Sequence, residues 1–408
     1  MLRAPYATYL ILSGGSSLAF ATVITINLVY QTQTVGLNPL QLVLVGTVLE
    51  GAVFIGEVPT GIVADVYSRR LSVIIGLFLT GIGFLIEGLV PAFGAILVAQ
   101  IVWGIGFTFI SGAKEAWIAD EIGEKRAARA FLRGSQASHV GALVGIGLSV
   151  LLASMDLKLA IVGGGILYLT LGCIMILIMP ETGFKRSPRG ESTWTGMIDM
   201  LRSGTNLIRM RPALITIFTV TLIFGMFSEG YDRLWTPHLL SQFTFPILWN
   251  LSPVIWFGII SAGSLFISLF VIQVINRKLD TDNDQALIRS LMVIHLLIIG
   301  AVIGFALTSQ FALALAATWI FSILRGVKEP ITTIWMNRQI GSKNRATVLS
   351  MNSQADAVGQ IGGGPVLGVI ATVRSIPAAL ITGSALLVPI LFLFRCKALT
   401  SGQKHCGD

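Results

Sequence analysis

The sequence predicts an all-α membrane protein, with about twelve transmembrane helices that form two six-helix, pseudo-symmetric bundles. The first observation is composition: 54% of the 408 residues are hydrophobic and only 12% are charged, whereas ordinary soluble domains carry about 25% charged residues. The second observation is a row of apolar runs of helix length, and the third is an internal repeat. A soluble fold could not bury this much apolar surface, whereas a lipid bilayer solvates it.

Apolar runs bounded by polar turns mark the candidate spans. A crossing of the bilayer takes about 20 largely apolar residues, and runs of that kind recur along the chain. Those of the first half cover residues 8–30, 40–63, 71–90, 93–117, 134–154 and 158–179. Those of the second half cover residues 213–234, 250–274, 287–307, 310–333, 346–371 and 376–394. The expected organisation is a bundle at 1–180, a linker at 181–212, a bundle at 213–395 and a tail at 396–408.

One segment of the first half recurs in the second. Residues 122–137 read IGEKRAARAFLRGSQA and residues 340–355 read IGSKNRATVLSMNSQA, with seven identical positions and no gap. Both copies fall where the fourth span of a half ends and the fifth begins. Parallel repeats of six helices build transporters whose substrate site lies between the halves. The repeat therefore favours a transport function.

Lysine and arginine lie mainly on one side of the predicted spans. Basic residues are enriched in cytoplasmic segments and set the orientation of membrane proteins. With the N-terminus in the cytoplasm, that side holds Arg3, Arg69, Arg70, residues 125–133, the 180–212 stretch, residues 277–289, residues 338–345 and residues 395–404. The opposite side holds little beyond Lys158 and Arg374. We expect a multi-pass protein of a bacterial-type inner (plasma) membrane with both termini cytoplasmic. The net charge of +8 then reflects orientation, not nucleic-acid binding.

The central polar stretch carries a helical pattern of its own. Apolar residues recur at helical spacing, at Trp194, Met197, Ile198, Leu201 and Ile208. Arg202 and Arg209 flank them, which is typical of an amphipathic helix on the inner membrane surface. A disordered linker is the alternative.

The turn after the second span carries a recognisable motif. Residues 61–70 read GIVADVYSRR, with a glycine, an aspartate four residues later and then two arginines. Together with GEVPT at 56–60 and SGAKEAWIAD at 111–120, this segment resembles the signature loop of the major facilitator superfamily and its drug-efflux (drug:proton antiporter) branch. The resemblance implies the major facilitator fold. Val66 and Ser68 depart from the family pattern, which has a basic residue and a glycine there.

The resemblance also implies a gate at the cytoplasmic end. The negative charge of Asp65 would be stabilised by the positive dipole end at the N-terminus of a nearby helix. In the family this partner is the eleventh helix. Arg69 and Arg70 are expected to pair with acids such as Asp120 or Glu121, and the alternative is that they only anchor the inner membrane surface. The residues assigned to the gate are Gly61, Asp65, Arg69, Arg70, Lys114 and Glu115, with Arg325, Lys328 and Glu329 on the tenth span.

Charged residues inside membrane spans are functional candidates by default. On the seventh span, Glu229, Asp232 and Arg233 follow i, i+3 and i+4 spacing and share one helix face. On the tenth span, Arg325 and Glu329 have the same i, i+4 spacing. We expect two polar layers, one toward the outer end of the bundle and one toward the inner end. Static salt bridges that only neutralise buried charge are the alternative.

Asp356 lies mid-helix on the eleventh span, with no basic residue within one turn. A carboxyl group in such an apolar environment is a candidate for proton exchange near neutral pH. The predicted proton-coupling residues are Asp356, Glu229, Asp232 and Glu50. For Asp356 and Glu50 the alternative is a neutral, hydrogen-bonded packing residue. The same span carries a glycine-rich run with Pro365, similar to a motif of proton antiporters that usually lies on the fifth helix; close packing is the alternative.

In the resembled superfamily, spans 1, 4, 7 and 10 line the central cavity. The residues expected to line it here are Asn27, Phe107, Phe224, Phe227, Arg233 and Trp319. The aromatic rings would stack on an apolar ligand. Packing against neighbouring helices or lipid is the alternative.

Nothing in the sequence indicates an enzyme. It has no phosphate-binding loop with lysine and no nucleophile–base pair, and Cys173, Cys396 and Cys406 have no metal-binding spacing. No catalytic residue, metal or cofactor is therefore expected. We predict a monomeric secondary transporter that exports small lipophilic or cationic molecules by proton antiport, with its substrate, protons and the lipid bilayer as partners. The alternatives are a proton-coupled importer and a membrane receptor or scaffold that does not transport.

Overall fold

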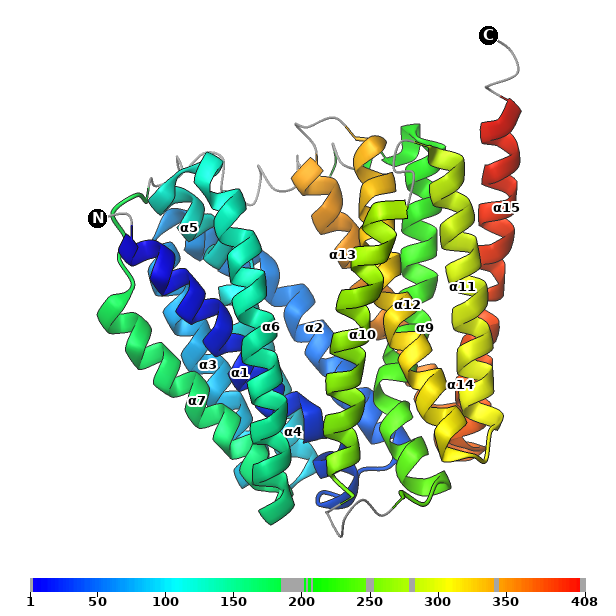
Figure 1. Cartoon of the computed structure of the whole chain (residues 1–408), viewed down its shortest axis with the longest axis horizontal. Helices are drawn as coiled ribbons and strands as arrows, with labels where there is room; N and C mark the ends of the chain where they lie inside the picture. Colours follow the sequence, from blue (N-terminus) through cyan, green and yellow to red (C-terminus); the bar gives the residue numbers. More distant parts are fainter. Residues whose placement is uncertain are drawn as a thin grey trace. The chain divides into compact units, whose positions relative to one another are not determined.

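The structure, a computed structural model, describes residues 3–184, 202, 205–206, 208–246, 253–278, 283–340 and 345–403. Within these ranges every regular element is a helix (Figure 1). Eleven helical segments of the described chain are long and apolar enough to cross a membrane, and a shorter apolar helix spans Ile255–Ser268. The predicted all-α membrane fold is confirmed. The predicted surface helix of the central stretch lies almost wholly outside the described residues.

The chain divides into two compact units. The N-terminal unit comprises Met1–Leu37, Val48–Met197 and Pro246–Ala262. Its helices are α1 (Arg3–Gln33), most of α2 (Pro39–Val66), α3 (Arg69–Leu89), α4 (Phe93–Ile110), α5 (Ala113–Ile122), α6 (Glu124–Met155) and α7 (Leu157–Ile178).

The C-terminal unit comprises Asn38–Thr47, Ile198–Phe245 and Gly263–Asp408. It begins with the first turns of α2, which pack with this unit. Its other helices are α9 (Pro212–Gln242), most of α10 (Ile255–Lys278), α11 (Asp284–Leu307), α12 (Phe311–Arg338), α13 (Arg345–Val373), α14 (Ile376–Leu386) and α15 (Val388–Gln403).

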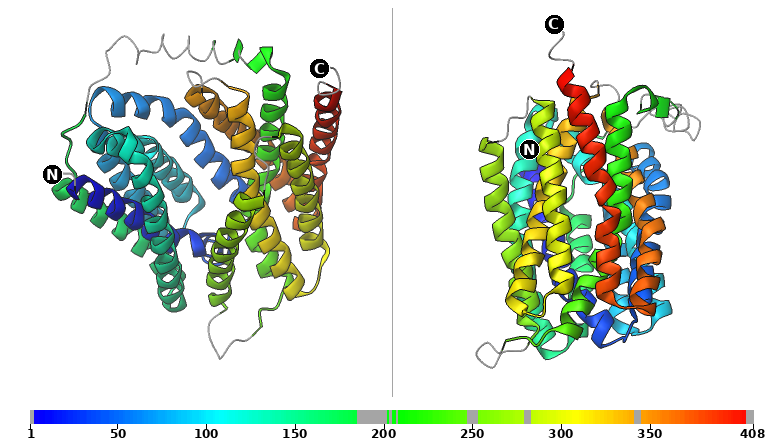
Figure 2. Two further views of the ribbon diagram at one scale, coloured as in Figure 1. Left: turned by 45° about the horizontal axis from the view of Figure 1, so that its top comes forward. Right: turned by 90° about the vertical axis from the view of Figure 1, so that its right-hand side faces the viewer.

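The two units repeat the same internal packing. In the N-terminal unit α1 packs on α6 and α7, while α3 packs on α4 and α7 (Figures 1 and 2). In the C-terminal unit α9 packs on α13 and α14, while α11 packs on α12 and on α14 and α15. These are corresponding pairs when the spans of each half are counted from one to six. The internal repeat of the sequence is thus matched by a repeat of helix contacts.

Glycines bring the backbones of the main helix pairs together. A side chain at Gly141 of α6 would meet the Gly14 carbonyl of α1, and one at Gly145 would meet the Leu18 carbonyl. In the other unit, a side chain at Gly359 of α13 would meet the Leu222 carbonyl of α9. Small residues let helix backbones approach closely, which matters in membranes because the hydrophobic effect does not drive helices together in lipid. The glycine-rich run of α13 therefore has a packing role, and α13 continues through Pro365.

Side-chain caps explain where several helices begin. The first free backbone N–H groups of a helix need acceptors, and a membrane-embedded chain has little water to supply them. Ser68 accepts from the Leu71 N–H at the start of α3. The residues that cap α7, α11 and α14 in the same way are Asp156, Asn283 and Ser375.

Two predicted spans are interrupted. The predicted span 93–117 is present within one candidate span, Phe93–Ile122, but it is not one regular helix: Gly112 has a φ of 73°, which separates α4 from α5. Only glycine adopts this left-handed conformation at little cost. The predicted 376–394 span divides into α14 and α15 at Leu387. Pro389 follows this break, and proline cannot donate the backbone hydrogen bond that would continue the first helix.

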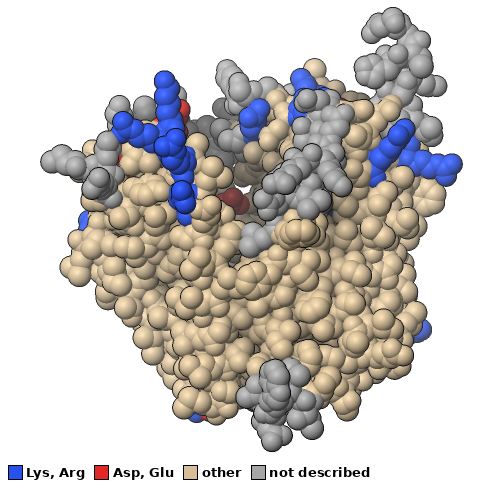
Figure 3. Space-filling view, viewed as in Figure 1, with Lys and Arg blue, Asp and Glu red and all other residues tan. Residues whose placement is uncertain are grey.

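Basic side chains gather at one end of each unit. Figure 3 shows lysines and arginines of the visible face at the end of the N-terminal unit where α5 and the start of α6 lie and at one end of the C-terminal unit, with a broad, largely uncharged wall on the rest of this face. Arg126, Arg129 and Arg133 of α6 are exposed at this end. An uncharged wall is what contact with lipid tails requires, and the basic edge agrees with the charge bias of the sequence.

The positive φ of Gly112 gives a testable prediction. Gly112→Ala adds no steric contact, since no atom lies within 4 Å of the added carbon, but it forces a left-handed conformation that costs about 1–2 kcal/mol. We expect a lower thermal unfolding midpoint in detergent. Gly147→Ala in α6 is the matched control, with equally open space in a helical backbone, and should be neutral or slightly stabilising. Equal destabilisation by both substitutions would contradict this account of the break.

Candidate functional site

A cluster of charged side chains lies within the membrane-spanning helices of the C-terminal unit. On α9, the Arg233 Nε donates to the Glu229 Oε1 at 2.9 Å. Glu229 is 2% exposed, so this is a buried ion pair. Burying either charge alone would cost several kcal/mol, on the order of 3–5 when a buried pair is broken. The i, i+4 spacing read from the sequence thus brings these two residues into contact.

Gly46, in the first turns of α2, makes room for this pair. A side chain there would overlap the Glu229 carboxylate and approach the Arg233 guanidinium. Nearby, the Leu40 N–H donates to the Thr372 Oγ1 of α13 at 3.0 Å. The first turns of α2 therefore pack against the charged cluster of the C-terminal unit.

Asp232 connects α9 to α12. The Arg325 Nη1 donates to both Asp232 carboxylate oxygens, at 2.6 and 2.7 Å. The sequence predicted separate outer and inner polar layers, with Arg325 spaced to meet Glu329. The structure instead joins the two sets of residues through the Asp232–Arg325 pair. The sequence could not reveal this because spacing along one helix says nothing about partners on another.

Lys328 of α12 is the third base of the cluster and is 8% exposed. Its Nζ lies 3.3 Å from the centroid of the Phe224 ring of α9 and 3.7 Å from the Glu329 Oε2. A cation over an aromatic face is stabilised by the ring quadrupole, and more strongly where water is excluded. Phe224 was predicted as a ligand-stacking residue; here its ring face holds the Lys328 ammonium.

Asp356 of α13 faces the same cluster. Its Oδ2 accepts from the Gln360 Nε2 at 2.9 Å, and the charges of Lys328 and Arg325 act on it. The sequence showed no base within a turn of α13, and the structure supplies these bases from α12. A side chain at Gly225 of α9 would meet the Asp356 carbonyl, so close packing of α9 and α13 sets the position of the carboxyl group.

The motif residues of the N-terminal unit form a second cluster, where α3, α5 and the end of α7 meet. Arg69 forms an ion pair with Asp120, donates to the Ala116 carbonyl at 2.8 Å and lies 3.6 Å from Asp65. The Arg69–Asp120 pair was one of the pairings expected from the sequence. The other expected acid, Glu121, instead accepts from the backbone N–H groups of residues 182 and 183, at 2.6 and 2.7 Å.

Ser68, which departs from the family pattern, has a defined role in this cluster. It caps α3 and its hydroxyl donates to the Glu181 Oε2 at 2.6 Å. The Arg70 N–H donates to the other Glu181 oxygen at 2.9 Å, and the Arg70 Nη2 donates to the Ile176 carbonyl at 2.6 Å. The turn is therefore tied to the end of α7.

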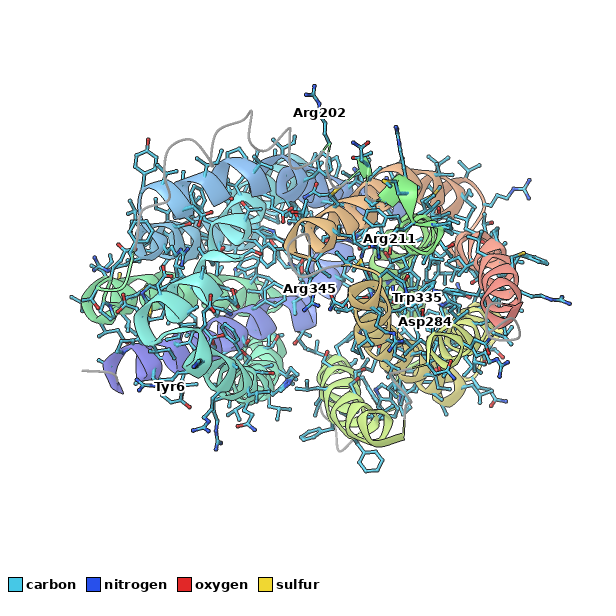
Figure 4. All side chains as sticks on the ribbon, turned by 90° about the horizontal axis from the view of Figure 1, so that it is seen from above. Tyr6, Arg202, Arg211, Asp284, Trp335 and Arg345 are labelled. Carbon is cyan, nitrogen blue, oxygen red and sulfur yellow. The ribbon has the colours of Figure 1, made fainter. Side chains whose placement is uncertain are left out.

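The C-terminal unit has a matching cluster with the charges reversed. The Arg338 Nε at the end of α12 donates to the Asp284 Oδ1 at the start of α11, at 2.7 Å. Arg338 precedes one copy of the sequence repeat by two residues, as Asp120 precedes the other. Arg211 adds a hydrogen bond to the Gln339 carbonyl. Figure 4 views this end from above, with Asp284 and Arg211 labelled.

The remaining predicted residues have varied surroundings. Lys114 pairs with its neighbour Glu115 at 3.3 Å. Gly61 has open space where a side chain would be. Among the predicted cavity residues, Phe227 is 1% exposed and packs on Phe224, Tyr231 and Phe321.

The other residues predicted to line the cavity differ in how far they are buried. Asn27 is 5% exposed, whereas Phe107 is 49% exposed. Trp319 is half-buried and packs over Gly263. Glu50 on α2 is also half-buried.

The sequence analysis did not single out several polar residues of these helices. Gln360 lies one turn after Asp356, a spacing that could have suggested a partner. Arg338 could have been found by extending the repeat two residues toward the N-terminus, whereas its partner Asp284, at the start of α11, lies outside the repeat. Glu87, an acidic residue near the end of the third predicted span, is fully buried.

The helical fold, the repeated packing and the charges inside the spans define a membrane transporter built from two related bundles. The sequence pattern described as Major Facilitator Superfamily matches residues 9–327. The chain belongs to this superfamily and is a transporter of that type.

Two relatives come from Bacillus subtilis (strain 168). The uncharacterised MFS-type transporter YxaM is 23% identical over 354 residues, covering 86% of each chain. Multidrug resistance protein 2 is 21% identical over 308 residues, covering 75% of this chain and 73% of its own.

Solved structures share the fold. A bacterial homologue of the human lysosomal transporter Spinster, inward-facing and unoccupied, has a TM-score of 0.76 at 15% identity, covering 97% of this chain and 98% of its own. The nucleoside transporter NupG has a TM-score of 0.77 at 14% identity, covering 96% and 98%.

The reversed charges of the two matching clusters can be tested by exchange. Arg69→Asp and Asp120→Arg should each destabilise the protein, because each places like charges together. The double variant recreates the polarity of the Asp284–Arg338 pair and should recover part of the loss, with an interaction free energy of about 0.5–3 kcal/mol. Recovery is incomplete because an aspartate at position 69 still faces Asp65. Thermal unfolding in detergent measures the cycle, with the exposed Arg126→Asp as the charge-change control. Losses that simply add in the double variant would contradict a direct Arg69–Asp120 pair.

Proposed function

We propose that this protein exports small lipophilic or cationic molecules by proton antiport with alternating access. In this proposal residues 1–180 and 213–395 are the two moving bundles, 181–212 is the cytoplasmic linker and 396–408 is the tail. The protein would lie in a bacterial-type inner membrane with both termini in the cytoplasm. The basic edge of each unit supports this orientation (Figure 3).

The charge balance of the cluster is the observation that carries the proposal, and Glu329 is its exposed member, with 73% of its side chain accessible. Three bases are matched by three acids, in the pairs Glu229–Arg233, Asp232–Arg325 and Lys328–Glu329. Asp356 is a fourth acid within the field of the same bases. With every group ionised, the cluster therefore carries one negative charge in excess.

Water solvates the exposed Glu329, whereas Asp356 is half-buried. An ionised carboxyl in a low-dielectric environment is costly, so Asp356 attracts one positive charge. A proton on Asp356 neutralises the cluster, and so does one monovalent cation held nearby. The proton and a cationic substrate would then compete for the same charge. Such competition is the physical basis of antiport, since each binds when the other has left.

The aromatic surroundings support the choice of substrate. The Phe224 ring already holds one cation, the Lys328 ammonium, at 3.3 Å, and the same chemistry suits a lipophilic cation. The relative named Multidrug resistance protein 2 also favours drug-like compounds. The Spinster-like, nucleoside and peptide transporters among the solved neighbours support only the fold at 13–15% identity.

The gate assignment of the motif residues belongs to the same proposal. Asp65, Arg69 and Arg70 hold the ends of α3, α5 and α7 together. A bundle whose helix ends are tied in this way can rock as one body. Asp65 is 54% exposed at its side chain and remains available for a partner in one of the two states.

The test is accumulation of a fluorescent lipophilic cation in cells that express the wild type, Asp356→Asn or Glu124→Gln. Asparagine keeps the hydrogen bond with Gln360 but removes the excess charge. We expect lower accumulation with the wild type, reversal by a protonophore, and a loss of at least tenfold in efflux rate with Asp356→Asn. Glu124→Gln alters an exposed carboxyl at the start of α6 and should pump like the wild type.

The outcomes separate the rival functions. Protonophore-sensitive uptake that raises accumulation would favour a proton-coupled importer. Binding of the purified protein to the dye with no flux in liposomes would favour a receptor or scaffold. Full activity in Asp356→Asn would move the coupling site to Glu229 and Asp232.

A further inference from the structure

A second buried carboxyl group lies in the other unit. Glu87, in the last turns of α3, has no solvent exposure. Phe84, Trp103 and Tyr30 belong to the buried hydrophobic core of the same unit. It lies in the N-terminal unit, apart from the Asp356 cluster, and the function proposed above does not use it.

Hydrogen bonds from two helices converge on Glu87. The Gln31 Nε2 of α1 donates to its Oε1 at 2.7 Å, and the Gln100 Nε2 of α4 donates to its Oε2 at 3.1 Å. The Tyr30 hydroxyl donates to the Glu87 backbone carbonyl at 2.8 Å. The group therefore joins the three helices α1, α3 and α4 within one unit.

Trp103 fixes one of these contacts. An indole N–H can only donate, and the Trp103 Nε1 donates to the Gln100 Oε1 at 2.9 Å. Gln100 must then turn its Nε2 toward Glu87. The Oε2 of Glu87 is therefore held as an acceptor whether or not the carboxyl group carries a proton.

The Gln31 side chain can either donate a hydrogen bond to Glu87 or accept one from it. Its Oε1 is buried and has no hydrogen-bond partner among the described residues, so turning the amide by 180° breaks no bond made by that oxygen. After the turn, Oε1 lies where Nε2 lay, 2.7 Å from the Glu87 Oε1. That separation matches an O–H···O hydrogen bond, for which about 2.7–2.8 Å is the commonest length.

We propose that Glu87 is a proton-binding site whose protonation is accompanied by rotation of the Gln31 amide. In the protonated state, the Glu87 hydroxyl donates to the Gln31 Oε1. When the proton leaves, the amide turns back and Nε2 donates to the carboxylate. Burial favours the neutral form of Glu87, while the two amide donors favour the charged form.

The charged and titratable groups near this site are few in the described chain. Tyr30 faces it from α1, while α4 contributes the uncharged Gln100 and Trp103. At the start of α7, Asp156 and Lys158 form an exposed pair at 3.4 Å, and the charges of Asp156 and Glu87 both act on Tyr30. The proposal is independent of Asp356 and of the direction of transport.

Infrared difference spectroscopy of the purified full-length protein in lipid tests the proposal without any substrate. Spectra at acidic and alkaline pH, in H2O and D2O, report each protonated carboxyl group by its C=O band. We expect Glu87→Gln, an isosteric change, to remove one such band, equal to one carboxyl per chain. Glu124→Gln, at an exposed carboxyl, should leave that band in place.

A second variant addresses the amide. Gln31→Met keeps the bulk of the side chain, but its thioether is only a weak hydrogen-bond acceptor for the Glu87 hydroxyl, so the band assigned to Glu87 should shift to higher frequency. The proposal is overturned if no band that titrates is lost in Glu87→Gln, or if Gln31→Met leaves the band at its wild-type frequency. Failure of the export proposal would not change the interpretation of these two spectra, because neither spectrum depends on transport.

Discussion

The structure depends on one constraint: a bilayer solvates neither a lone charge nor an unpaired backbone group. The helices meet the second part of this constraint with their own backbone hydrogen bonds, and side chains cap exposed helix starts at Ser68, Asp156, Asn283 and Ser375. Charged residues avoid being unpaired by forming ion pairs between helices, as in the Asp232–Arg325 pair of α9 and α12. Glycines on α6 and α13 allow close packing within each unit, of α6 on α1 and of α13 on α9.

The two units satisfy the constraint with the same framework but different chemistry. Both place their main helix contacts in corresponding pairs, and both join the start of the third helix to the end of the fourth by an ion pair. The C-terminal unit has a network of charges, including the carboxyl of Asp356. The N-terminal unit has a buried carboxyl, Glu87, held by neutral amides. A shared fold thus carries two different kinds of carboxyl site.

Sequence reasoning reached the fold because the determinants of the fold are local. Apolar run length gave the spans, and i, i+4 spacing gave the Glu229–Arg233 contact. It missed the break at Gly112, since a single glycine within an apolar run does not reveal its φ. It also missed the Asp232 partner of Arg325 and the bases that act on Asp356, because these come from other helices. Side-chain pairing across helices is set by packing, which no spacing along one chain encodes.

Proton antiport is the central claim, and its most direct test is proton movement in proteoliposomes that enclose a pH-sensitive dye. With no imposed pH gradient, an outward gradient of a membrane-impermeant cationic substrate is applied. The account predicts that substrate leaving the vesicles drives protons inward and acidifies the lumen, and that Asp356→Asn abolishes this acidification. Alkalinisation of the lumen would indicate that substrate and protons move together, and substrate flux without any pH change would contradict proton coupling.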